Sequence, residues 1–178
     1  HEHIVAKSLF SAGTTWPGVF LAEDQAALGV LCSRPDVDPT RVGCCGLSGG
    51  GLRTDFLAAL DERIACSVTV GWMTTWRDLV LAKSWTHTWM VYVPGLPPLM
   101  DFPEILSLRL PKPTLVQNTR QEPLFTLGEA ERCDRILREC WAKAASPDTF
   151  RMSFYDGPHK FDVPMQEEAF AWLGRWLA

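Results

Sequence analysis

Short apolar runs alternate along this chain with longer stretches in which apolar residues recur at helical spacing. Four runs are short enough to be buried parallel strands, at residues 42–45, 66–71, 113–118 and 150–155. Helical spacing is found at about residues 16–33, directly after residue 48, and at about residues 127–144 and 164–177. Strands that alternate with helices predict an α/β fold, a parallel sheet with right-handed crossovers and helices on both faces.

One junction between a predicted strand and a predicted helix carries candidate chemistry. Residues 46–50 read Gly-Leu-Ser-Gly-Gly. An abrupt strand-to-helix turn strains the residue at its centre, so the residues two before and two after must be small, as Gly46 and Gly50 are. Such a turn raises the Ser48 hydroxyl above the sheet edge, where the Gly49 N–H can stabilise an oxyanion. Ser48 is the candidate nucleophile; the alternative is a glycine-rich turn that merely caps a helix.

A serine nucleophile needs a base within hydrogen-bond reach, and the chain has four histidines. His1 and His3 lie at a terminus that we expect to be mobile. His87 lies in a tryptophan-rich segment, where a packed or surface histidine is the ordinary role. His159 follows the fourth predicted strand in the turn at residues 156–161, on the side of the sheet expected for Ser48. We therefore predict His159 as the base, against the alternative of an ordinary loop histidine.

The acid that orients the base should follow the third predicted strand. Glu122 is the only carboxylate in the loop at residues 119–125. It is longer than an aspartate but can hold an imidazole in the same way. The alternative is a solvated surface glutamate, in which case Asp148 or Asp156, on either side of the last strand, would be the acid.

Length and charge limit the classes of function. A chain of 178 residues has the length of a single domain and can bury a sizeable core. A formal net charge of -4 without a basic cluster excludes the usual nucleic-acid-binding surfaces. The sequence contains neither an apolar run of membrane-spanning length nor the pattern of a secretory signal. We expect a soluble, cytoplasmic protein that does not act on membranes.

The six cysteines, Cys32, Cys44, Cys45, Cys66, Cys133 and Cys140, are scattered without the spacing of a zinc site. Structural thiols in a reducing compartment are favoured over a disulfide framework. Cys45 lies close to the candidate nucleophile, but as part of the incoming strand it is expected to point into the core. No metal or organic cofactor is implied.

The sequence around the motif resembles the α/β-hydrolase superfamily, nearest to its acetyl xylan esterase and dienelactone hydrolase-like branches. The likeness includes residues 34–60, which lead through the Gly-Leu-Ser-Gly-Gly motif, residues 58–64 and the His-Lys-Phe-Asp run at residues 159–162. The order Ser48, Glu122, His159 is the order of nucleophile, acid and base in that fold. The resemblance implies a catalytic triad and hydrolysis of carboxylic esters, with short acyl groups, through an acyl-enzyme. Glu122 stands where that family more often has an aspartate.

The resemblance also implies that strands preceding residue 16 in the family are missing here. We therefore expect the C-terminal part of an α/β-hydrolase fold, as a fragment or a naturally reduced hydrolase. The strand that leads to Ser48 would then have an exposed edge, and such edges tend to pair. We expect a second copy, giving a homo-oligomer, or a separate segment to cover it, and a small-molecule ester as the substrate.

The stretch between the second and third predicted strands, residues 72–110, is crowded with large apolar side chains and interrupted by prolines. It is either a cap that lines an acyl or alcohol pocket over Ser48 or ordinary packing on the sheet. A peptidase or thioesterase would share the triad chemistry. The alternative from another class is a non-catalytic remnant or interaction module that keeps the fold without a complete oxyanion hole.

Overall fold

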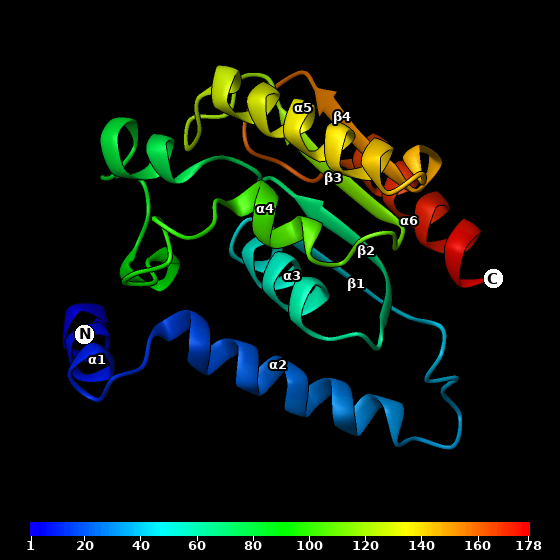
Figure 1. Cartoon of the computed structure of the whole chain (residues 1–178), viewed down its shortest axis with the longest axis horizontal. Helices are drawn as coiled ribbons and strands as arrows, with labels where there is room; N and C mark the ends of the chain where they lie inside the picture. The colour runs from blue at the N-terminus through cyan, green and yellow to red at the C-terminus, as the bar shows by residue number, and fades with distance from the viewer.

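The fold is built on one parallel sheet, seen in a computed structural model that describes residues 1–178 (Figure 1). Each strand pairs in parallel with the next one along the chain, so the sheet order is β1-β2-β3-β4. The strands are β1 (Val42–Leu47), β2 (Ile64–Val70), β3 (Thr114–Thr119) and β4 (Phe150–Tyr155). The predicted α/β class and all four predicted strands are confirmed.

Helices cover both faces of the sheet. The helix α3 packs against β1 and β2, α5 against β4, and α4 lies between α3 and α5, while α6 covers the opposite face (Figure 1). Short single turns are η1 (Asp78–Ala82), η2 (Trp89–Val91) and η3 (Pro147–Thr149). The helices are α1 (Glu2–Ser11), α2 (Trp16–Cys32), α3 (Gly49–Leu60), α4 (Phe102–Ser107), α5 (Leu127–Lys143) and α6 (Val163–Leu177). The four predicted helices correspond to α2, α3, α5 and α6.

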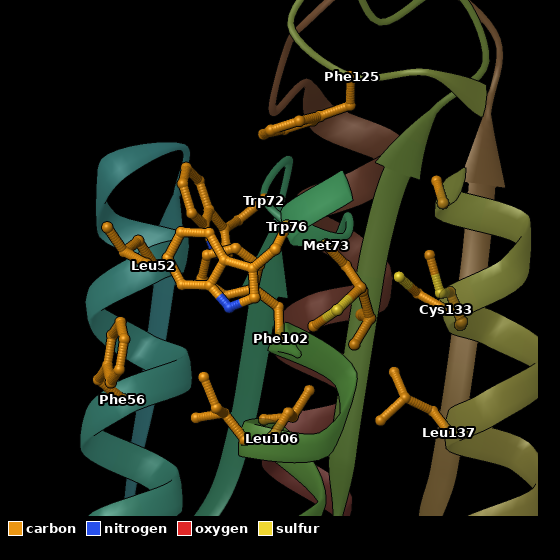
Figure 2. Packing of buried hydrophobic residues seen from close by; sticks show 14 of the residues in the cluster. Leu52, Phe56, Trp72, Met73, Trp76, Phe102, Leu106, Phe125, Cys133 and Leu137 are labelled. Atoms are coloured by element: carbon orange, nitrogen blue, oxygen red, sulfur yellow. The ribbon is translucent and has the colours of Figure 1, made fainter. Parts of the chain in front are cut away.

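The two faces of the sheet bury separate apolar clusters because successive side chains of a strand point in opposite directions. In β3, Leu115 packs with Met165 and Trp172 of α6, whereas Val116 belongs to the larger cluster beneath α3, α4 and α5. That larger cluster contains 19 buried residues. Its large aromatic side chains, including Trp72, Trp76 and Phe102, lie between α3 and α5 (Figure 2). Burying each such side chain contributes roughly 1.5–3 kcal/mol.

The N-terminal residues form a helix, which the sequence did not predict. His1 is the N-cap of α1. His3 Nδ1 accepts a hydrogen bond from Trp89 Nε1 at 2.6 Å, and Glu2 Oε1 accepts one from the Trp89 backbone N at 2.9 Å. The expectation of a mobile terminus around His1 and His3 is therefore replaced by a helix that is tied to η2.

The segment at residues 72–110 is buried at some positions and exposed at others. Trp72, Trp76 and Phe102 are buried in the larger core cluster. Trp85 and Leu99, in contrast, are 76% and 77% exposed. The segment forms only the short elements η1, η2 and α4, with Pro94, Pro97 and Pro98 between η2 and α4, so it forms no continuous helix. Part of the segment therefore packs on the sheet, and part of it projects beyond the sheet.

The strand β1 is at one edge of the sheet and pairs only with β2. As a consequence, Cys45 is exposed, and the expectation that it points into the core was wrong. All six cysteines are free thiols. No helix combines the length and the apolar character needed to cross a membrane.

Candidate active site

Ser48 occupies the turn between β1 and α3. Its backbone has φ 60° and ψ -119°, a conformation that L-residues rarely adopt and that costs of order 1–3 kcal/mol. Its N–H donates to the Val70 carbonyl at the end of β2, at 2.8 Å, and its carbonyl accepts from the Leu52 N–H at 3.0 Å. Ser48 is thus a strained residue held by hydrogen bonds at both its N–H and its carbonyl group, at the carboxyl edge of a parallel sheet. This is the form of a nucleophile elbow.

Of the two glycines that the motif predicts to be required around Ser48, Gly46 is required and Gly50 is not. A Cβ on Gly46 would lie 2.2 Å from the Gly50 carbonyl oxygen, so Gly46 is required by the close approach of the following helix. A Cβ on Gly50 would meet nothing within 4 Å. The tight position is instead Gly51, where a Cβ would lie 2.8 Å from the Val70 carbonyl oxygen and from Trp72 Cβ. The steric requirement thus falls two residues before and three residues after Ser48.

The loops that follow β3 and β4 are joined to each other beyond the sheet. The Arg120 N–H donates to the Tyr155 carbonyl at 2.8 Å, and the Gln121 N–H donates to the Gly157 carbonyl at 3.2 Å. The Gly157 N–H in turn donates to Gln121 Oε1. These bonds hold the loop after β3 and the loop after β4 side by side. Glu122 lies on the first of these loops and His159 on the second.

Glu122 and His159 form a hydrogen-bonded pair. His159 Nδ1 lies 2.7 Å from Glu122 Oε2. The same carboxylate accepts from Thr119 Oγ1 at 3.2 Å and, through Oε1, from the Leu124 N–H at 3.1 Å. The Glu122 side chain is 3% exposed and that of His159 is 22% exposed. The Glu122 carboxylate is thus held by two protein donors and can also accept a hydrogen bond from His159 Nδ1, a pairing that leaves Nε2 free to accept a proton.

The imidazole of His159 lies against the end of β2, next to the anchor of Ser48. A Cβ on Gly71 would be 2.9 Å from His159 Cε1 and 3.2 Å from Nδ1. Gly71 follows Val70, whose carbonyl binds the Ser48 N–H. The imidazole of His159 and the Ser48 N–H thus contact two consecutive residues, Gly71 and Val70. Ser48 Oγ and His159 form no hydrogen bond with each other.

Gly49 begins α3, where the first N–H groups of a helix have no partner within the helix. The Met90 methyl group of η2 is the nearest atom to the position of a Gly49 Cβ, at 3.8 Å. The Met90 side chain of η2 therefore lies close to the first residue of α3.

The other candidate acids lie apart from the imidazole. Asp156 is exposed and pairs with Arg120 at 3.7 Å. Asp148 is in η3, which leads into the opposite end of β4. Neither forms a hydrogen bond with His159, whereas Glu122 does.

His87 is packed rather than exposed. Its ring stacks on Phe125 with centroids 5.0 Å apart and meets the edge of Trp72 at 5.4 Å. Burial lowers the pKa of His87 to about 4, so the ring is neutral at neutral pH. His87 thus has the packed role that the sequence suggested. Sequence reasoning missed Gly71, for which a glycine directly after an apolar strand was the only available signal.

Comparisons with known proteins place this geometry in context. No family model matches the sequence. A curated protein of Bacillus subtilis (strain 168), "Putative hydrolase YtaP", is 28% identical over 177 residues, which are 99% of this chain and 59% of the relative. The chain therefore spans little more than half the length of that protein.

Solved esterase structures share the fold. A glucuronoyl esterase from Solibacter usitatus superposes with a TM-score of 0.75 at 15% identity, over 91% of this chain and 49% of that one. A "putative acetyl xylan esterase" from Bacteroides fragilis gives 0.75 at 16% identity, over 87% and 40%. The glucuronoyl esterase catalytic domain from Hypocrea jecorina gives 0.71 at 18% identity, over 90% and 51%.

The resemblance predicted from the sequence is thus confirmed at the level of the fold. Acetyl xylan esterases are among the structural neighbours, as expected. The chain therefore has the α/β-hydrolase fold of these esterases and spans about half of their length.

Proposed function

We propose that this chain carries the catalytic residues of a serine hydrolase that cleaves carboxylic esters, with short acyl groups, through an acyl-enzyme. Ser48 is the nucleophile, His159 the general base and Glu122 the residue that orients the imidazole. The backbone N–H of Gly49 donates to the oxyanion. The single observation that carries the proposal is the 2.7 Å contact between His159 Nδ1 and Glu122 Oε2, at the rim where Ser48 is strained.

The proposed reaction follows from these positions. Ser48 Oγ attacks the ester carbonyl carbon while its proton passes to His159 Nε2. The tetrahedral intermediate collapses, the bond to the alcohol oxygen breaks, and that oxygen takes the proton from Nε2. Water then attacks the acyl-enzyme by the same path and releases the acid. Glu122 stabilises the imidazolium without taking its proton.

Two kinds of support bear on the substrate class. The solved neighbours are described as esterases, and the curated relative is described as a hydrolase. Their likeness in sequence to this chain is low, so the ester class rests equally on the arrangement of the three side chains. The strained serine turn is a feature of acyl transfer to a hydroxyl.

A fluorophosphonate probe tests the proposal. We expect it to label the wild-type chain and to fail with Ser48→Ala, while Ser11→Ala, an exposed serine of α1, is labelled normally. Hydrolysis of 4-nitrophenyl acetate should fall with the labelling, and 4-nitrophenyl esters of longer acids should react more slowly in the wild type.

A folded wild-type chain that neither reacts with the probe nor hydrolyses the acetate would contradict the proposal. That outcome would favour a non-catalytic module with the same fold. Circular dichroism of each variant distinguishes a lost nucleophile from a lost fold.

A further inference from the structure

A cavity of about 400 Å³ opens within the segment between β2 and β3, and it lies outside the proposed triad. Its lining residues are Val80, Ser84, His87, Trp89 and Tyr92. Small-molecule sites usually occupy roughly 300–1,000 Å³. We propose that this cavity binds the leaving alcohol group of the ester, and that it takes an uncharged, apolar group of about the size of an aromatic ring. This inference rests on the proposed function.

The wall formed by His87 joins the cavity to the loops that hold the proposed acid and base. Phe125, on which His87 stacks, follows Glu122 by three residues. Trp72, whose ring meets His87 edge to face at 5.4 Å, follows the glycine that touches the imidazole of His159. The cavity therefore adjoins the side of the site on which His159 lies.

The wall formed by η2 joins the cavity to the elbow. Trp89 lines the cavity, and the next residue, Met90, reaches to 3.8 Å from the position of a Gly49 Cβ. The cavity is thus bounded by residues that adjoin both the base and the oxyanion donor.

The order of proton transfer decides which part of the ester this position suits. The base returns the nucleophile's proton to the departing oxygen, so the alcohol must lie on the imidazole side of the carbonyl. The carbonyl oxygen itself is directed at the Gly49 N–H. A cavity whose wall backs onto Glu122 and His159 is therefore placed for the alcohol.

The lining determines which alcohols fit. Thr86 Oγ1 lies 2.7 Å from the Lys83 carbonyl oxygen and 2.6 Å from His87 Nδ1, so the His87 ring is held by its Nδ1 edge. Val80, Trp89 and Tyr92 present apolar or aromatic surface. Since no lining residue is charged at neutral pH, the cavity offers no partner for an ionic alcohol.

The aromatic wall is held in place before any ligand binds. The indole of Trp89 donates to His3 Nδ1, its backbone N–H donates to Glu2 Oε1, and its ring meets Phe10 at 6.1 Å. These contacts make α1 the support of the cavity. A wall that is already ordered loses little conformational freedom on binding.

Two acetates that differ only in the alcohol test the proposal, 2-phenylethyl acetate and methyl acetate. Full burial of a phenyl-sized group corresponds to a roughly 10- to 100-fold gain in kcat/KM for the larger ester. Val80→Trp fills the cavity from a half-exposed position and should lower the ratio of the two kcat/KM values at least fivefold. Leu99→Trp, in the same segment but outside the cavity, should leave the ratio unchanged.

Ser84→Trp fills the cavity from a second exposed position and replaces Val80→Trp if that variant fails to fold. An unchanged ratio in a folded, filled variant would overturn this proposal while leaving ester hydrolysis intact. A wild-type chain that cleaves neither acetate would instead overturn the proposed function, and this inference with it.

Discussion

At the scale of single residues, the site depends on positions where backbone comes close to a side chain. Gly71 has φ +60°, and its missing Cβ leaves room for the imidazole of His159. Its N–H donates to the Gln117 carbonyl at 2.7 Å, which continues the pairing of β2 with β3. Gly71 is thus a turn residue and also the residue against which the His159 imidazole packs. These two roles can be separated by mutation.

Gly71→Ala should lower kcat by at least tenfold, because the new methyl group would lie 2.9 Å from His159 Cε1 and push the ring out of line with Ser48. The positive φ adds a loss of stability of about 1–2 kcal/mol. Steady-state kinetics and thermal unfolding measure the two effects.

Gly95→Ala is the matched control for the backbone. Gly95 has φ +81°, but nothing lies within 4 Å of the position of its Cβ. It should lose similar stability and keep its kcat. Equal loss of activity in the two variants would show that Gly71 matters only for folding.

Glu122→Gln should lower kcat roughly 10²- to 10⁴-fold. The glutamine oxygen can still accept from the Leu124 N–H, but its amide nitrogen then faces His159 and donates to Nδ1. That arrangement places the imidazole proton on Nε2, the wrong nitrogen for a base. Kinetics with 4-nitrophenyl acetate measure the effect.

Asp156→Asn is the control for the acid, since Asp156 is the exposed carboxylate of the neighbouring loop. It should keep nearly full activity. If Asp156→Asn lost activity and Glu122→Gln did not, the acid of the proposed triad would have to be reassigned.

At the scale of elements, the sequence predicted those that bury apolar residues in a regular pattern. The four strands and α2, α3, α5 and α6 were all expected from periodicity. The approach of Glu122 to His159 was also predictable, because parallel strands direct their following loops to one edge. The hydrogen bonds that join those two loops are long-range and left no trace in the local sequence.

The helix α1 was missed for a physical reason. Only Ala6 of its residues is buried, and no side chain caps its N-terminus. It is held by contacts of Glu2 and His3 with Trp89, more than eighty residues away. The exposure of Cys45 had the same kind of origin, since the edge position of β1 depends on which strands pair. Local patterns cannot supply information of that range.

The interface between α3 and β2 contains a buried carboxyl group whose state should depend on pH. Asp55 accepts from Thr69 Oγ1, its Oδ2 has no partner, and burial raises its pKa to about 8. The folded chain therefore keeps a proton that the unfolded chain loses above pH of about 4. Between these pKa values the stability contributed by Asp55 falls as pH rises, by about 1.4 kcal/mol per pH unit.

Asp55→Asn imitates the protonated side chain and should remove this dependence. The difference in unfolding free energy between wild type and variant should shift in favour of the variant between pH 5.5 and pH 7.5. Urea denaturation at the two pH values measures it, and the remaining carboxylates cancel in the difference. A constant difference would mean that Asp55 is ionised in the folded chain.

At the scale of the whole molecule, the site lies beside an open edge. The strand β1 carries Ser48 at its carboxyl end, and its outer side has no strand partner. Its residues Cys45 and Leu47 are exposed, so neither a helix nor a loop covers that edge fully. Unpaired backbone N–H and C=O groups along a strand favour pairing with another chain.

We therefore predict that this chain self-associates through β1, unless a separate segment supplies the neighbouring strand. Sedimentation velocity should show dimers or larger species whose share grows with concentration. Cys45→Lys places a charge on the edge and should shift the population towards monomer, because two such edges repel each other when paired. Val30→Lys, an exposed position on α2, is the control and should leave association unchanged. A strictly monomeric chain with full esterase activity would show that the nucleophile's strand needs no neighbour, and that the hydrogen bond from the Ser48 N–H to the Val70 carbonyl suffices to hold the elbow.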